Sequence, residues 1–159
     1  MFSSSRKISL FALFIFSLLV FQSCDSKRLF EDNKIIENRV WNNQDKATFK
    51  VTITDILARY NFYFNLRNSS NYPYSNIYLF LKTVFPDGRI ARDTIECQLA
   101  DYDGKWLGSG ISDVKFNRFL FQKGVRFPKK GQYIFEVEQA MRVKDLKGIS
   151  DIGIRIERQ

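Results

Sequence analysis

The chain has 159 residues, of which 45% are hydrophobic and 16% aromatic, and its formal net charge is +8 at pH 7. It contains no histidine and only two cysteines, which excludes the familiar zinc and copper sites and Ser-His-Asp catalysis. No basic block is longer than the pair Lys129-Lys130, so the charge indicates a solvated surface rather than a nucleic-acid groove.

Residues 1–23 have the organisation of an export signal. Arg6 and Lys7 precede an apolar run of fourteen residues, 8–21, that is interrupted only by two serines. A membrane-spanning helix needs about 20 apolar residues, so this run is too short to serve as one. We therefore expect residues 1–23 to be cleaved and the mature chain to begin at Cys24.

The sequence Phe21-Gln22-Ser23-Cys24 resembles the lipobox of bacterial lipoproteins, in which the cysteine sulfur is acylated before cleavage. Two or more acyl chains hold a protein at a bilayer where one does not. We expect Cys24 to be lipidated and to tether a soluble domain to a membrane of the cell envelope, at the periplasmic face or the outer membrane. The alternative is an ordinary secreted protein with a cysteine near its cleavage site.

The 136 residues that follow the signal suit a single domain. Residues 24–34 are mostly polar and charged, which predicts a short tether, and the folded domain is expected to span residues 35–159. With Cys24 acylated, Cys97 has no disulfide partner. Because Cys97 alternates with polar neighbours, we expect it to be a small buried hydrophobic residue rather than a reactive thiol.

Alternation of apolar and polar residues predicts strands through most of this domain. Two turn sequences, Pro86-Asp87-Gly88-Arg89 and residues 127–131, separate pairs of predicted strands. Seven or eight short strands with such turns predict an all-β fold, a single β-sandwich of immunoglobulin-like or jelly-roll-like type. In chain order, the predicted strands are 49–53, 60–66, 77–85, 90–99, 116–121, 133–137 and 152–156.

Two loops stand out between the predicted strands. The first, 68–76, carries Tyr72, Pro73 and Tyr74, and the second, 100–110, is rich in glycine and carries Trp106. Loops on a rigid sandwich commonly carry binding residues, and aromatic side chains there can contact a protein partner or stack on a sugar. Alternatively, Trp106 plugs one end of the hydrophobic core.

Carboxylates in and near the second loop raise the question of a metal or catalytic site. Asp101, Asp103 and Asp113 lack the further ligands of an EF-hand calcium loop, so we interpret them as solvated turn residues. A glycosidase-like pair drawn from Asp101, Asp103 and Glu96 is the least favoured function. The sequence thus predicts no metal, no cofactor, no nucleic acid and no small-molecule substrate.

Several short motifs together carry a resemblance to a known family. They occur in a fixed order over most of the mature chain, and the export signal with Cys24 precedes them. The motifs are residues 68–77, 85–88, 93–96, 104–108, 127–128, 138–142, 146–149 and 151–153. In order and spacing, they resemble the GldH-type gliding-motility lipoprotein family of Bacteroidetes.

The resemblance implies a non-catalytic, lipid-anchored envelope protein of the gliding machinery that works alongside type IX secretion. The family has no assigned enzymatic activity, so only Cys24 transfers as a functional residue. We expect the domain to act through contacts with proteins of that apparatus. The alternative is a carbohydrate-binding lipoprotein that uses Tyr72, Tyr74 and Trp106.

Overall fold

A computed structural model describes residues 26–159, so the expected signal and Cys24 lie outside the described residues. Residues 26–159 contain one short 3-10 helix, and the rest of the regular structure is β-strand. No helix in this range is long and apolar enough to cross a membrane. The elements are β1 (Arg28–Ile35), η1 (Glu37–Arg39), β2 (Val40–Asn42), β3 (Ala47–Ile53), β4 (Tyr60–Ser69), β5 (Asn76–Val84), β6 (Ile90–Gln98), β7 (Val114–Val125), β8 (Gly131–Gln139), β9 (Asp145–Lys147) and β10 (Ile149–Arg158).

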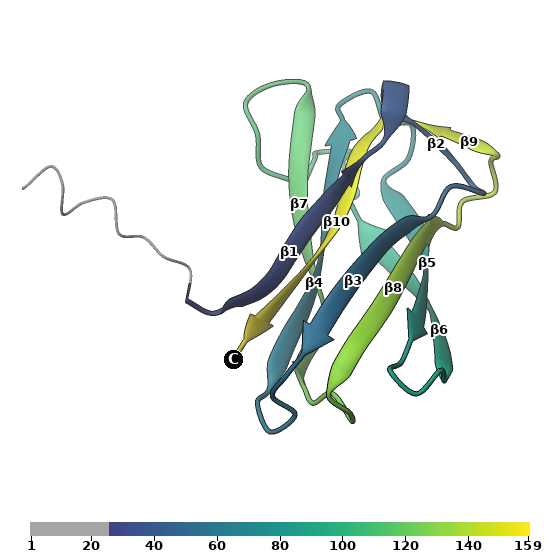
Figure 1. The fold of residues 1–159 in the computed structure, drawn as a ribbon. Helices are drawn as coiled ribbons and strands as arrows, with labels where there is room; N and C mark the ends of the chain where they lie inside the picture. The colour runs from purple at the N-terminus through teal and green to yellow at the C-terminus, as the bar shows by residue number, and fades with distance from the viewer. Residues whose placement is uncertain (1–25) are drawn as a thin grey trace, which may run out of the picture.

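The strands form two four-stranded antiparallel sheets that face each other, which confirms the predicted all-β sandwich (Figure 1). One sheet has the order β1-β10-β4-β7, and the other has the order β3-β8-β5-β6. A short β2–β9 pair lies at one end. We call this end, with the loops 70–75, 99–113 and 140–144, the loop end. The opposite end, where β1 begins and β10 stops, is called the entry end.

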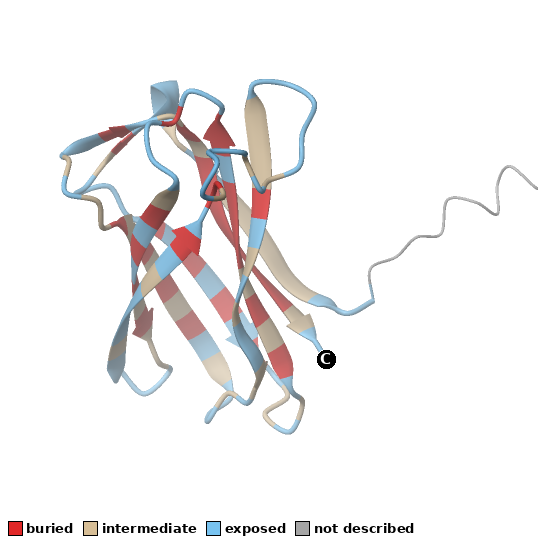
Figure 2. Ribbon diagram, turned by 180° about the vertical axis from the view of Figure 1, so that it is seen from behind, coloured by how far each residue is buried: buried red, intermediate tan, exposed pale blue. Residues whose placement is uncertain are grey.

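The core fills the space between the sheets with alternate side chains from each strand, and Figure 2 shows buried and exposed residues alternating along them. Aromatic rings dominate its centre. The Phe62 ring of β4 contacts Phe64, Phe121 and Phe135, with centroid separations of 5.1–5.7 Å. Because Phe135 belongs to the facing sheet, this cluster joins the two layers.

The β5–β6 hairpin confirms the pairing and the turn predicted at Pro86-Asp87-Gly88-Arg89. Its register runs from Asn76 opposite Gln98 to Val84 opposite Ile90. The Phe85 amide donates to the Arg89 carbonyl, and the Gly88 amide donates to the Phe85 carbonyl, both at 2.9 Å. Gly88 has a φ of 84°, a conformation that glycine adopts without strain.

The expected boundary between tether and domain needs correction. Residues 24–34 were expected to form a tether, but Arg28–Ile35 is β1, which pairs antiparallel with β10 along its length. As a result β10 is a central strand between β1 and β4. Within the described part of the expected tether, residues 26–34, only 26 and 27 lie outside a strand.

Cys97 is 1% exposed in β6, as expected for a small buried hydrophobic residue. Burial, together with the nearby charge of Glu96, raises the pKa of its thiol to about 12. We therefore expect no reaction with a thiol reagent such as DTNB in the native protein, because the thiolate is the reactive form. The reagent should label Cys97 only as fast as the domain unfolds. Fast labelling without denaturant would contradict the burial of this thiol.

Candidate functional site

Loop 70–75, which joins β4 to β5, holds the three residues that we singled out around Pro73. Tyr72 is only 4% exposed, and its hydroxyl donates to the Asn76 carbonyl at 3.0 Å. Its ring meets Tyr74 edge-on, with the centroids 5.6 Å apart and the planes at 70°. Pro73 and Tyr74 are exposed, so Tyr72 supports the loop while its two neighbours face solvent.

The turn between β9 and β10 packs directly beneath Tyr72. Gly148 has a φ of 92°, and a Cβ there would lie 3.1 Å from the Tyr72 Cα. The Ser69 amide donates to the Gly148 carbonyl at 2.7 Å. This position requires glycine for both its conformation and its space, and it ties the start of β10 to loop 70–75.

Tyr74 also lines a shallow groove of about 500 Å³ with Tyr78, on the outer side of the sheet that contains β5. The opposite wall is loop 140–144, and Met141 is its largest apolar side chain. Gln139 is buried and organises this loop, because it accepts from the Met141 amide at 2.8 Å and donates to the Val143 carbonyl at 2.9 Å. The groove therefore brings together two motifs of the family resemblance that are far apart in sequence.

Trp106 lies in loop 99–113, which connects β6 to β7. It is partly buried, packs against the core and forms an isolated β-bridge with Ala100. Sequence reasoning missed three other apolar side chains in this loop. Tyr102 and Ile111 are fully exposed, and Leu107 is 59% exposed.

Backbone hydrogen bonds join loops 70–75 and 99–113 into one surface. The Ser75 carbonyl accepts from the amides of Leu99 and Ala100, at 2.7 and 2.9 Å. The Ser70 amide donates to the Asp113 carbonyl at 2.6 Å, and Arg39 pairs with the Asp113 carboxylate at 2.9 Å. The exposed apolar residues thus project from loops that are fixed at both ends.

The geometry gives little support to a sugar platform or a cation site at the loop end. Of the three aromatic residues proposed for sugar stacking, Tyr72 is buried and Trp106 is partly buried, which leaves Tyr74 as the exposed ring. Asp101 accepts from the backbone amides of Asp103 and Lys105, so it stabilises its own turn. Across residues 26–159, no three acidic or cysteine side chains gather where a metal ion could bind.

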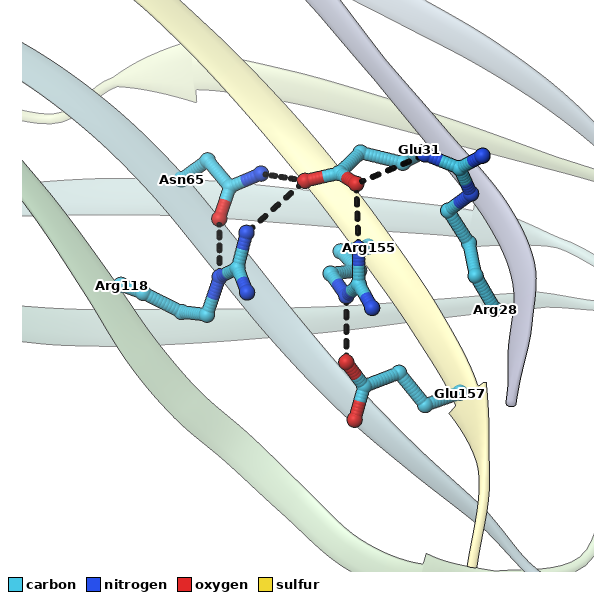
Figure 3. A network of polar contacts seen from close by, with 6 residues as sticks. All are labelled: Arg28, Glu31, Asn65, Arg118, Arg155 and Glu157. Atoms are coloured by element: carbon cyan, nitrogen blue, oxygen red, sulfur yellow. Dashed lines mark hydrogen bonds and ion pairs between the residues drawn. The ribbon is translucent and has the colours of Figure 1, made fainter. Parts of the chain in front are cut away.

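A polar network on the outer face of the other sheet fixes β1 to its neighbours (Figure 3). Glu31 of β1 accepts from Asn65 of β4 and from Arg118 of β7, each at 2.9 Å. Its second oxygen accepts from Arg155 of β10, which also pairs with Glu157. One carboxylate of β1 therefore contacts side chains from every other strand of the sheet.

Burial decides how strong this network is. The Arg155 side chain is 8% exposed and that of Glu31 is 21% exposed, so both charges are largely removed from water. Burial alone would raise the pKa of Glu31, but hydrogen bonds from Arg155 and Asn65 and the charges of Arg155 and Arg118 lower it below its usual value. The carboxylate is thus held ionised by its partners.

The fold defines a class of protein, a small β-sandwich with exposed apolar side chains on loops at one end. Comparison with known proteins identifies the family. The family model described as GldH lipoprotein matches residues 28–156, so the chain belongs to the GldH lipoprotein family.

Two curated relatives resemble the chain over nearly its whole length. A gliding motility lipoprotein GldH homolog of Christiangramia forsetii is 34% identical over 153 residues, which cover 92% of this chain and 93% of the relative. Gliding motility lipoprotein GldH of Flavobacterium johnsoniae is 35% identical over 154 residues, which cover 92% and 94%. The resemblance inferred from the short motifs is confirmed.

Proposed function

We propose that the chain is a non-catalytic, lipid-anchored protein of the cell envelope that serves the gliding-motility machinery through protein–protein contacts of its loop end. Acylated Cys24 provides the anchor, and the partners belong to the gliding apparatus and its associated type IX secretion system. The observation that carries this proposal is the family match over residues 28–156 to gliding-motility lipoproteins.

The arrangement of the sandwich supports separate places for membrane anchoring and for partner contact. The chain enters the domain at Arg28, at the end opposite loops 70–75 and 99–113 (Figure 1). The ten residues of β4 span roughly 33 Å at about 3.3 Å per residue. A membrane anchor at Cys24 therefore attaches next to the end opposite these loops, so the loop end can extend away from the bilayer toward a protein partner.

The chemistry of the loop end favours a protein partner over a small molecule. Tyr102, Leu107 and Ile111 protrude as exposed apolar side chains, and Tyr74 borders a shallow groove rather than a closed cavity. Protein interfaces are enriched in such aromatic and apolar anchors, whereas ligand sites enclose most of their ligand. These residues are the ones that we expect to contact the partner.

Cross-linking and co-purification from the native envelope test both parts of the proposal. The intact mass of the purified protein should correspond to a chain that begins at an acylated Cys24, and a Cys24→Ala variant should lose membrane attachment. An uncut precursor or an unmodified Cys24 would contradict the anchor.

The same purification tests the loop end. A variant with Leu107→Ser and Ile111→Ser should recover its cross-linked partners at least tenfold less well, because a few residues buried at the centre of an interface carry most of its binding energy. Leu120→Ser is the matched control, since Leu120 is 49% exposed but lies on the face of a sheet. Equal recovery by the loop variant and the control would overturn the assignment of the contact surface.

A further inference from the structure

The distance between the anchor and the folded domain is short. Four residue steps separate Cys24 from Arg28, where β1 begins, and a fully extended chain covers at most about 3.6 Å per step. Cys24 can thus lie no more than about 14 Å from the start of the sandwich. If Cys24 is acylated, as proposed above, the entry end is confined to the immediate neighbourhood of the lipid headgroups.

The positive charge of the domain is concentrated at this same end. Nine exposed lysine and arginine side chains lie there: two at the start of β1, four between Lys123 and Lys130, and Arg59, Arg89 and Arg158 on adjoining segments. Lys123, Arg126 and Lys130 form no ion pair with any residue between 26 and 159, so their charge is free to act on a partner.

Few acidic side chains oppose these charges. Four carboxylates pair with residues of this end: Glu31 with Arg28, Asp55 with Arg158, Asp87 with Lys129 and Arg89, and Glu157 with Arg155. The remaining described residues hold 14 basic and 12 acidic side chains and are therefore nearly neutral. The excess charge belongs to one end of the molecule rather than to its surface as a whole.

An exposed apolar side chain also lies at the entry end. Leu57 is 80% exposed in the loop between β3 and β4. The loop is rigid, because the Asp55 carboxylate accepts from the amides of Leu57 and Ala58, at 3.0 and 3.2 Å, and the Tyr60 hydroxyl donates to the Asp55 carbonyl at 2.7 Å. An exposed leucine among basic residues is the pattern of a surface that rests in the membrane interface.

We infer that the entry end docks on anionic phospholipid headgroups of the membrane that holds the Cys24 lipid, with Leu57 inserted into the interface. This inference rests on the proposed anchoring. Docking fixes the orientation of the sandwich, so that the loop end points away from the bilayer instead of sampling all directions on a flexible tether. The lipid provides attachment, and the basic surface with Leu57 provides orientation.

Vesicle binding by an unacylated protein tests the docking surface independently of the anchor. The chain 24–159 with Cys24→Ala retains every element of the fold. It should co-sediment with vesicles of phosphatidylcholine and phosphatidylglycerol, but not with phosphatidylcholine alone, and binding should weaken with salt. Changing Lys123, Arg126 and Lys130 to glutamine should weaken binding about 100-fold, at roughly fivefold per basic residue near the surface. The matched control, Lys105, Lys115 and Lys144 to glutamine, should change it little.

A fluorescent probe tests the orientation. The dye NBD attached to Leu57→Cys should shift to the blue on anionic vesicles, whereas NBD on Tyr102→Cys, at the loop end, should not. Cys97 is buried and does not compete for the label in the folded protein. Equal binding to neutral vesicles, equal losses in the two triple variants, or equal shifts of the two probes would each overturn the docking surface.

The two proposals can fail separately. If Cys24 proves unacylated in the native envelope while the Cys24→Ala chain still binds anionic vesicles, the anchor is wrong and the docking surface stands. If Cys24 is acylated but the Cys24→Ala chain binds anionic and neutral vesicles equally, the docking surface is wrong and the anchor stands.

Discussion

Replacing Glu31 with alanine is expected to lower the free energy of unfolding by about 2–4 kcal/mol. The substitution removes one carboxylate partner of Arg155, whose side chain is 8% exposed. It also removes the acceptor of the hydrogen bonds from Asn65 and Arg118. Losing a carboxylate beside a buried guanidinium is costly, and urea denaturation monitored by circular dichroism would measure the loss.

Glu136→Ala on the other sheet is the matched control. The Glu136 side chain is 20% exposed, close to the 21% of Glu31, but its partners Lys82 and Lys46 are 28% and 48% exposed. Water can replace a carboxylate beside partners that are already solvated, so this loss should stay below about 1 kcal/mol. Equal losses for the two variants would show that burial of the partner does not determine the strength of the network.

The Glu31 network also has a defined pH dependence. Because the folded-state pKa of Glu31 is lowered below its ordinary value of 4.5, its contribution is complete above that pH and is lost as the pH falls through the folded pKa. The difference in unfolding free energy between the wild type and Glu31→Gln should therefore narrow in acid. A gap that stays constant from pH 7 to acid unfolding would contradict the ionised carboxylate.

Alternation predicted β3 and β5 well because most of their polar positions are not buried. The strand predicted at 60–66 is β4, Tyr60–Ser69, and its observed end extends through Asn68 and Ser69. These two residues are polar yet buried, and Asn68 accepts from the Asn117 amide group at 2.8 Å. A pattern that equates polar with exposed stops such a strand too early.

The assumption that polar residues are exposed also explains why the sequence did not predict β1 and why one face of β10 was unexpected. Gly153 and Arg155 alternate with isoleucines, a pattern in which such positions ordinarily face solvent, but both are buried. Polar residues of β1 cover them, Asn33 beside Gly153 and Glu31 beside Arg155, and these residues are in sequence typical of a tether. A strand that packs through ion pairs and hydrogen bonds lacks the alternation of apolar and polar residues from which strands are predicted.

The candidate site was predictable only in part, for a similar reason. The sequence located the two loops correctly, because their glycines, proline and polar residues interrupt the strand pattern. It could not assign exposure within them, since an aromatic or aliphatic residue is as compatible with the core as with a binding surface. Tyr72 proved to be buried, whereas Tyr102, Leu107 and Ile111 are exposed without having been singled out.

Gly153→Ala is expected to cost about 3 kcal/mol of stability, because it forces β1 away from β10. A Cβ at this position would lie 1.7 Å from the Asn33 Oδ1 and 2.6 Å from the backbone carbonyl oxygen of Asp32. The side chain of Asn33 can move aside, but the Asp32 backbone cannot do so unless the strand shifts. Thermal and urea unfolding would measure the loss, and amide exchange would show whether β1 opens first.

The variant Asn33→Ala separates these two contacts. The Asn33 Oδ1 is buried without a hydrogen-bond partner, so its removal alone should cost little. Combined with Gly153→Ala, it should recover only part of the lost stability, because the contact with the Asp32 carbonyl remains. Complete recovery of stability would show that the Cβ clashes only with the Asn33 side chain, which would contradict a shift of the strand.

Gly153→Ala and Glu31→Ala should also be less than additive. Both loosen β1, and a strand that is already displaced by the alanine no longer presents Glu31 to Arg155. Because β1 lies next to the proposed anchor, such a displaced strand would lengthen the tether and release the entry end from the membrane surface. The double variant should therefore unfold at nearly the same denaturant concentration as the more damaging single variant, whereas full additivity would show that the two contacts hold β1 independently.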